Sequence, residues 1–395
     1  MAITDQIHRV ANAKLVTARR LCFGGALLLS LGLAACNSKP AAVDIGLVQP
    51  LSGPLAALGT DMKRGAELAI KEINATGGVS IGGDSVQLRL LARDDKSDPK
   101  VGVSAANELV SQGIVASIAN LNSGVSIESA PIYAKAGVPQ LAISTNPRYT
   151  QLGLSTTLRL VASDALQAQA IGVFAAQLPG VKRVALLDDS TPYGKSLAEG
   201  AGKAVEALKV QITSRTSVDD KTTEFKGLIE KLKQSTADVL ITTLSDFQVD
   251  ALLDQLVGAG LGEMVVIGGD TIKTPRLAKA PKRVRALYAS SPINEPKEFP
   301  GGNEFVERFK AQYHADVAYA AHYAYDAVFQ IADAMSRNRS TDKAALLQTL
   351  KSFDGNCPAT NAIRFNANGE QRYGSIGIYQ IHKGAWESIM RSDKW

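Results

Sequence analysis

The sequence predicts an α/β fold in which parallel strands are covered by helices on both faces. From residue 43 onward, short apolar runs alternate with longer amphipathic segments. This order is typical of parallel strands joined by crossover helices. The chain has 395 residues, 45% of them hydrophobic and 21% charged. That composition is usual for a globular protein, and the length is more than one ordinary core needs and enough for two lobes.

The first expected strand covers residues 43–48, and the first expected helix covers roughly residues 60–75. Apolar side chains recur in this helix at a spacing of about 3.6 residues; they are Met62, Ala66, Ala69, Ile70 and Ile73. A second strand is expected over residues 86–91. Asp98 and Pro99 then supply the N-cap and first position of another helix, because aspartate accepts hydrogen bonds from free N–H groups and proline needs no donor there.

Further strands are expected at four later positions, each followed by a helical stretch or a turn; they cover residues 114–118, 184–187, 239–243 and 265–267. The sequence shows no obvious short repeat and no low-complexity tract. Two related lobes of this kind would not appear as a sequence periodicity.

The N-terminal segment is typical of an export signal. An uncharged run over residues 21–35 follows Arg19 and Arg20 and ends in small residues immediately before Cys36. A basic start, an apolar middle and small residues at the end define a secretory signal peptide. The run is shorter than the ~20 residues of a spanning helix. With cysteine at the next position the motif resembles a bacterial lipobox, which predicts removal of residues 1–35 and lipidation of Cys36; an ordinary signal peptide with an incidental cysteine is the alternative.

The charge and the cysteines exclude further classes. The leader contains four basic residues and one acidic residue and carries most of the net charge of +5. The rest of the chain has interspersed charges without the clustered basic face of a nucleic-acid-binding protein, so no nucleic acid partner is expected. Cys22 would leave with the leader, and Cys357 would then have no partner for an intrachain disulfide.

No metal or cofactor motif is present, and none is expected to bind. His314, His322 and His382 are not spaced with Cys or Glu as metal ligands. There is no Gly-x-Ser-x-Gly turn and no P-loop. The glycine-rich residues 258–262 end a helical pattern instead of opening one after a strand, which indicates a helix C-cap and not a dinucleotide site. The acidic residues 94–98 are similarly interpreted as a strand end and a helix cap, not as a calcium site.

Polar loops follow several of the expected strands, and open α/β sheets bind ligands at the carboxyl ends of their strands. Asn122 and Ser123 precede a helix, whose free N–H groups can bind a carboxylate. Ser144 and Thr145 add two hydroxyl groups after another apolar run, and Asp270 follows the strand at 265–267. Each of these residues taken alone is also an ordinary helix cap or loop residue.

A set of motifs in one order resembles the leucine/isoleucine/valine-type periplasmic binding protein family. The motifs are Leu51-Ser52-Gly53-Pro54, Gly65, Ile70-Lys71-Glu72-Ile73-Asn74, Gly77-Gly78, Asp94-Asp95 with Asp98-Pro99, Thr145-Asn146-Pro147 and Tyr193-Gly194. The resemblance runs from about residue 43 to the C-terminus and is weaker after residue 277.

The resemblance implies a type I periplasmic binding fold, in which two Rossmann-like lobes are joined by three hinge crossovers. The crossovers are expected near Val161, Ser290 and Glu370. The implied divisions are a signal peptide over 1–35, a tether over 36–42, lobe 1 over 43–162 plus 291–369, and lobe 2 over 163–290 plus 370–395.

The resemblance also implies roles for individual residues. Ser123, Ser144 and Thr145 match the positions that bind the α-carboxylate and ammonium of an amino acid. Tyr193 matches the tyrosine that reaches in from the second lobe. Asp270 stands where the family usually has an acidic residue that faces the ammonium. Charge-assisted hydrogen bonds of this kind contribute ~1.5–3 kcal/mol each.

Several positions depart from the family pattern. Ser97 and Asn122 occupy the places of a disulfide-bonded pair, so that link is absent. Leu58 stands where an aromatic residue commonly lines the side-chain pocket, and Ser245 and Asp246 stand where the relatives often place tyrosines. Asn122, Ser245 and Asp246 would make the pocket more polar and roomier than one built for leucine; an Asp246 that points outward and caps the following helix is the alternative.

These observations predict a lipid-anchored, extracytoplasmic solute-binding protein of an ABC importer. It would bind an amino acid of branched-chain type or an analogue, deliver it to a permease in the inner membrane, and perform no covalent chemistry. The same fold could instead serve a ligand-sensing regulator. A periplasmic hydrolase using Asp246 and Asp270 as an acid–base pair is a third reading, but it lacks a nucleophile or metal motif.

Overall fold

The computed structural model describes residues 42–394. Cys36, the predicted signal peptide and the predicted tether up to residue 41 therefore lie outside the described residues. Every strand expected from the sequence overlaps a strand of the structure.

The first sheet has six strands in the order β2-β3-β1-β4-β5-β6. The strands are β1 (Ala42–Gln49), β2 (Val79–Ile81), β3 (Asp84–Asp94), β4 (Ala116–Ala119), β5 (Gln140–Ala142) and β6 (Thr157–Arg159). All neighbouring pairs are parallel except the β2–β3 hairpin. Parallel strands need crossover connections, and helices provide most of them here.

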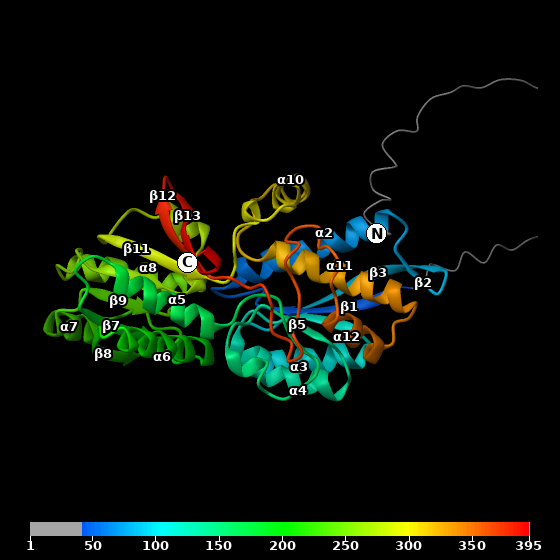
Figure 1. Ribbon diagram of the computed structural model, residues 1–395, viewed down its shortest axis with the longest axis horizontal. Coiled ribbons are helices and arrows are strands. Elements are labelled where there is room, and N and C mark those ends of the chain that lie inside the picture. The colour runs from blue at the N-terminus through cyan, green and yellow to red at the C-terminus, as the bar shows by residue number, and fades with distance from the viewer. Residues whose placement is uncertain (1–41, 395) are drawn as a thin grey trace, which may run out of the picture. The chain divides into compact units, whose positions relative to one another are not determined.

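Helices cover both faces of this sheet. Figure 1 shows α2 (Ala56–Ala75) and α11 (Ala321–Asn338) on one side of β1, with α3 (Pro99–Ser111) and α4 (Ser123–Lys135) on the other. Successive side chains of a strand point to opposite faces. Leu47 accordingly packs in the core cluster of α2 and α11, whereas Val48 packs with Leu109 and Tyr133 of α3 and α4. The helices α10 (Gly302–Tyr313) and α12 (Lys343–Lys351) add apolar residues to the first cluster.

The second sheet has seven strands in the order β13-β12-β11-β10-β9-β7-β8. The strands are β7 (Arg183–Asp188), β8 (Gln211–Ser217), β9 (Val239–Thr242), β10 (Val265–Gly268), β11 (Ala286–Ser291), β12 (Gly377–His382) and β13 (Ala385–Arg391). The strands from β8 to β11 run parallel, and β12 and β13 extend the sheet antiparallel.

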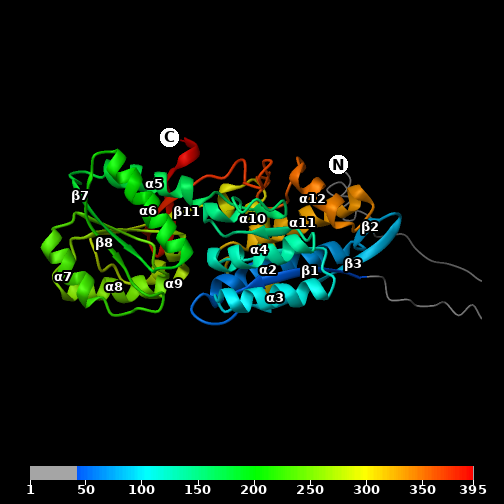
Figure 2. The same cartoon turned by 90° about the horizontal axis from the view of Figure 1, so that it is seen from below.

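This sheet is also covered on both faces. In Figure 2, α5 (Asp164–Gln177) and α6 (Pro192–Ala207) lie on one face, and α7 (Lys226–Ser235), α8 (Asp246–Gly258) and the short α9 (Pro275–Lys279) lie on the other. The described chain thus forms two α/β lobes with mostly parallel sheets, which confirms the predicted fold class.

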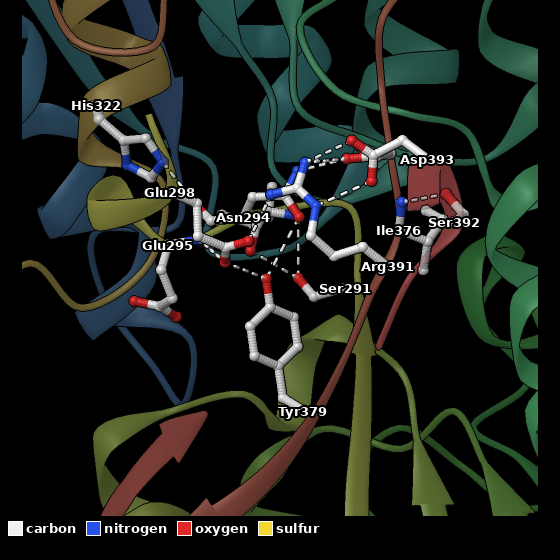
Figure 3. A network of polar contacts seen from close by, with 12 residues as sticks. Ser291, Asn294, Glu295, Glu298, His322, Ile376, Tyr379, Arg391, Ser392 and Asp393 are labelled. Carbon is white, nitrogen blue, oxygen red and sulfur yellow. Dashed lines mark hydrogen bonds and ion pairs between the residues drawn. The ribbon is translucent and has the colours of Figure 1, made fainter. Parts of the chain in front are cut away.

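A polar network packs around the segments that run between the sheets after β11 and before β12 (Figure 3). The guanidinium of Arg391, at the end of β13, forms ion pairs with Glu298 and Asp393 and donates to Ser375 Oγ at 2.9 Å. Asn294 donates to the same Ser375 oxygen at 3.0 Å. The carbonyl oxygen of Asn294 lies 3.0 Å from Nε2 of the buried His322 on α11. These contacts hold the two connecting segments to each other and to α11.

Two helix starts show what local sequence does and does not encode. The start of α3 is confirmed: Asp98 Oδ1 accepts hydrogen bonds from the N–H groups of Lys100 at 2.7 Å and Val101 at 3.1 Å. The expected start of α2 near residue 60 is wrong, because the helix already begins at Ala56 after an N-cap residue, Leu55, that makes no side-chain cap. Asp61, within this helix, binds the distant backbone of residues 318–321.

The glycine-rich and acidic segments have the structural roles that the sequence predicts. α8 ends at Gly258, Gly260 has φ of 78°, and the N–H of Leu261 donates to the carbonyl of Leu256 at 2.8 Å, which together form a helix end. Asp94 accepts from Ser52 Oγ at 2.5 Å and from the Leu51 N–H at 2.8 Å. Cys357 is buried and forms no disulfide bond with any residue of the described range 42–394.

Candidate functional site

Five of the predicted site residues lie beyond the carboxyl ends of parallel strands. Ser144 and Thr145 follow β5, and Ser123 is the first residue of α4, which follows β4. Tyr193 is the second residue of α6, after β7, and Asp270 follows β10. All but Tyr193 are buried, and Tyr193 is partly buried. Polar groups cost free energy when they are buried without partners, so their hydrogen bonds define the site.

Asp270 is surrounded by hydrogen-bond donors. Its Oδ1 accepts from the Tyr193 hydroxyl at 2.7 Å and from Gln167 Nε2 at 3.3 Å, and its Oδ2 accepts from the Tyr319 hydroxyl at 2.6 Å. Burial, reinforced by the negative charge of Asp270, raises the pKa of both tyrosines well above the usual value. Both hydroxyl groups therefore keep the protons that they donate to the carboxylate.

A second carboxyl group lies beside this cluster. Asp164 is the first residue of α5, and its side chain is 2% exposed. Its backbone N–H donates to the carbonyl of Thr145 at 2.8 Å, and Gln167 on the same helix reaches Asp270. Burial, and next the charge of Asp270, raises the pKa of Asp164 to about 8; the Thr145 hydroxyl and Arg159 act in the opposite sense. Apart from this contact with the Thr145 hydroxyl, neither carboxyl oxygen of Asp164 has a hydrogen-bond partner within the described residues.

A buried arginine holds the loop that contains Ser144 and Thr145. Arg159, on β6, donates to the backbone carbonyl groups of Ser144 and Asn146 and forms an ion pair with Glu370 at 2.9 Å. The arginine is thus committed to supporting the loop. The Ser144 hydroxyl is buried and has no hydrogen-bond partner within the described chain, so it is available to a ligand.

The start of α4 adjoins the same loop. Ser123 Oγ accepts from the N–H of Asn146 at 3.3 Å. Asn146 Nδ2 in turn donates to the carbonyl of Pro192, the first residue of α6, at 2.6 Å. Asn122 is the N-cap residue of α4 but makes no side-chain cap, and its buried Oδ1 finds no partner among residues 42–394.

The position of Tyr319 is set by Asp61 on α2. Asp61 Oδ1 accepts from the N–H of Ala318 at 2.7 Å, and Oδ2 accepts from the N–H groups of Tyr319 at 3.0 Å and Ala321 at 2.8 Å. Burial raises the pKa of Asp61 to about 6 against the effect of these backbone donors. Leu58, one turn earlier on α2, is buried in the core cluster that also contains Tyr319. Leu58 is thus near the segment that carries Tyr319, but no polar contact links it to Asp270.

Asp246 belongs to a different set of contacts. It is the first residue of α8, whose capping box is made by the preceding Ser245 and by Gln248. Its carboxylate accepts from Thr274 Oγ1 at 3.0 Å and pairs with Arg276 Nε at 3.1 Å. The structure therefore connects Asp246 to α9 and not to the group around Asp270.

Sequence reasoning missed Asp164, Gln167, Tyr319 and Asp61. Asp164 had a usable signal, because it follows β6 just as Ser144 and Asp270 follow their strands, and Gln167 is one helical turn later. Tyr319 and Asp61 had none, because their contact joins residues 258 positions apart.

No group of three or more His, Cys, Asp or Glu side chains in residues 42–394 could hold a metal ion. Over the same residues, no helix is both long enough and apolar enough to traverse a membrane.

Comparison with known proteins adds a family match that spans most of the chain. A family model described as periplasmic binding protein matches residues 42–385. Leu/Ile/Val-binding protein homolog 1 of Brucella suis is 30% identical over 370 residues, which cover 93% of this chain and 97% of the relative.

Solved structures share the fold. The structure of a leucine binding protein from Thermotoga maritima has a TM-score of 0.80 at 24% identity and covers 89% of this chain and all of its own. A solute binding protein from R. palustris in complex with benzoate has a TM-score of 0.79 at 17% identity, with 89% of this chain and 96% of that chain covered. At such identities the likeness concerns the fold alone.

Proposed function

The chain belongs to the family of periplasmic binding proteins, and on that premise we propose that it binds an amino acid for an ABC importer. The family consists of substrate-binding proteins of transporters and not of enzymes. The hydrolase reading of Asp246 and Asp270 is therefore set aside, and the carboxylates are interpreted as ligand-binding groups.

In this proposal the ligand's carboxylate binds at the start of α4 and at the loop after β5. Free N–H groups at a helix N-terminus favour an anion. The Ser123 and Thr145 hydroxyls and the unpartnered Ser144 hydroxyl add hydrogen-bond donors. Asn122, with its buried unpartnered oxygen, is proposed to face the ligand's side chain next to Leu58. We propose that Asp246 does not contact the ligand, because its carboxylate already binds Thr274 and Arg276.

The ligand's ammonium is proposed to bind at Asp270, beside Tyr193. The observation that carries the proposal is a short series of contacts that joins Thr145, proposed to bind the carboxylate, to Asp270, proposed to bind the ammonium. The backbone carbonyl of Thr145 accepts from the N–H of Asp164, and Gln167, on the same helix as Asp164, donates to Asp270. Hydroxyl groups suited to a carboxylate and a carboxylate suited to an ammonium thus adjoin the start of α5.

Binding is proposed to favour an arrangement in which both lobes contact the ligand. Tyr319 packs in the core of the first lobe, whereas Asp270 follows a strand of the second sheet. A ligand that contacts both sets of residues stabilises the form in which they are together, which is the basis of hinge closure.

Export and membrane attachment are also part of the proposal. Cys36 is proposed to be lipidated after removal of residues 1–35 and to tether the protein at the periplasmic, or otherwise extracytoplasmic, face of the membrane, where a permease would receive the ligand. The support is the sequence pattern before Cys36. A ligand-sensing regulator would bind the same ligand, so a transport assay with the permease genes separates the two.

A thermal-shift panel tests the ligand class. The panel contains the twenty L-amino acids, 4-methyl-2-oxopentanoate as leucine without its amine, and benzoate. Ligand at ~100 times its dissociation constant stabilises the protein by ~2.7 kcal/mol. We expect at least one amino acid to raise the melting temperature. If no amino acid does so and benzoate does, the ligand is an aromatic carboxylate and the amino-acid proposal is wrong.

A further inference from the structure

Asp164 is a buried carboxyl group of the site that has fewer donors than Asp270. Its side chain is 2% exposed, and apart from a contact with the Thr145 hydroxyl neither carboxyl oxygen has a hydrogen-bond partner within residues 42–394. Asp270 differs, because three donors already occupy its two oxygens. An ammonium has three N–H donors. It therefore finds more free acceptor capacity on Asp164 than on Asp270.

The charges around Asp164 favour the binding of a cation. The charged groups that act on it are Asp270, which follows β10, and Arg159, on β6. Arg159 is occupied by two backbone carbonyl groups and by Glu370. The other polar groups that face this cluster are Thr145 after β5 and the hydroxyls of Tyr193 and Tyr319. None of the hydroxyl groups supplies a positive charge, so two carboxyl groups share one buried site.

We propose that Asp164 and Asp270 bind the ligand's amine together, and that Asp164 releases its proton to solvent when the amine binds. This inference rests on the proposed function and adds a second carboxylate and a proton to it. Before binding, the Asp164 carboxyl is neutral, which avoids a second buried negative charge next to Asp270. On binding, its O–H bond breaks, the proton passes to the buffer, and the carboxylate accepts N–H donors of the ammonium.

The titration of Asp164 supports the direction of this exchange. Burial and Asp270 raise the pKa of Asp164 to about 8, so the carboxyl is mostly protonated at pH 7. A bound ammonium favours the charged form and lowers that pKa again. Affinity for an amine-bearing ligand should therefore increase from pH 6 to about pH 8 and then level off, by at most about tenfold per pH unit.

Calorimetry on the unmodified protein measures the proton directly. L-Leucine is titrated at pH 7 in phosphate and in Tris, which differ in ionisation enthalpy. We expect the two apparent enthalpies to differ by the amount that corresponds to release of about one proton. 4-Methyl-2-oxopentanoate, which keeps the carboxylate and the side chain but lacks the amine, should release none. If leucine gives no signal, the same titration uses whichever amino acid in the thermal-shift panel binds, with its 2-oxo acid.

Asp164→Asn identifies the source of the proton. The variant should bind leucine without proton release and without the increase in affinity between pH 6 and 8. At pH 8.5, where the native carboxylate is ionised, it should bind roughly tenfold to hundredfold more weakly than the unmodified protein. Asp326→Asn is the matched control: Asp326 is a buried aspartate that binds the backbone of residues 359 and 360, and this change should leave proton release intact.

The outcomes separate this inference from the proposed function. If no amino acid binds, the proposed function fails. If leucine binds with the same enthalpy in both buffers, or if Asp164→Asn retains proton release, the inference alone is overturned. The buffer comparison needs no variant, so it decides the question even if Asp164→Asn does not fold.

Discussion

The hydroxyl of Tyr319 donates a 2.6 Å hydrogen bond to Oδ2 of Asp270, although the two residues belong to parts of the chain that pack against different sheets. Burial and the carboxylate keep this hydroxyl protonated. The bond therefore links the two lobes at the residue proposed to bind the ligand's ammonium. It makes Tyr319 a residue whose loss should be detected in ligand affinity.

Tyr319→Phe should weaken leucine binding by roughly tenfold, because a hydrogen bond to a charged group contributes ~1.5–3 kcal/mol and here favours the arrangement that binds ligand. Isothermal titration measures the effect. Tyr313→Phe is the control, since the Tyr313 hydroxyl donates to the carbonyl of Arg64 and does not contact Asp270. Equal affinities in the unmodified protein and Tyr319→Phe would show that the Tyr319 bond does not support binding.

Asp61→Asn should lower both stability and affinity. Asn offers one carbonyl oxygen to three backbone N–H groups that now share a carboxylate. A buried donor left without a partner costs ~1–3 kcal/mol. Urea unfolding should show a loss of this size, and leucine should bind more weakly because Tyr319 is no longer held in place. A loss of stability with unchanged affinity would separate Asp61 from the site.

Local signals in the sequence were sufficient for much of the fold. Six strands, three in each sheet, the cap of α3 at Asp98 and the end of α8 were predictable because each depends on residues that are close in sequence. The start of α2 was not, because its N-cap residue, Leu55, makes no side-chain cap and its first turn has no acidic residue.

The same limit applies to the candidate site. Ser123, Ser144, Tyr193 and Asp270 could be found because the carboxyl ends of parallel strands are where α/β sheets bind ligands. Asp246 sits at an equivalent place, yet its carboxylate is paired with Arg276, thirty residues further along the chain. A one-dimensional pattern does not distinguish a strand-end carboxylate that is paired from one that is free. The position of Asp164 after β6 is readable from the sequence, but only the tertiary structure shows that, among the described residues, its carboxyl has just the Thr145 hydroxyl as a donor.

The stability of the unliganded protein should depend on pH through the titration of Asp164. With a folded pKa of about 8 and an ordinary value of 3.8, the folded state keeps a proton that the unfolded state loses between these values. Stability then falls as pH rises through this window, by about 1.4 kcal/mol per pH unit at most. The side chain at position 164 cannot ionise in the Asp164→Asn variant. The free energy of unfolding of this variant, relative to that of the unmodified protein, should therefore increase from pH 4 to pH 8.

Urea unfolding at pH 4.5, 6 and 7.5 checks this growth. In Asp326→Asn the corresponding change should stop near pH 6, because burial raises the pKa of Asp326 only to about 6. Parallel stability profiles for the unmodified protein and Asp164→Asn would mean that Asp164 titrates normally in the folded state.

Cys36→Ser should release the protein from the membrane. Only a thiol can accept the diacylglyceryl group, so the serine variant should leave the detergent phase and appear in the soluble fraction. Fractionation followed by immunoblotting measures the partition. Detergent-phase partitioning that is the same for both proteins would contradict lipid attachment at Cys36.

The most direct test of the central claim, that an amino acid binds here through its ammonium, is the affinity of Asp270→Asn for L-leucine. The change preserves shape and removes the charge, so we predict binding that is roughly tenfold to hundredfold weaker, with the melting temperature of the unliganded protein little altered. Asp254→Asn, at a largely exposed aspartate paired with Arg283, should bind normally. Unchanged leucine affinity in Asp270→Asn, with a lowered melting temperature, would contradict the account and remove Asp270 from the site.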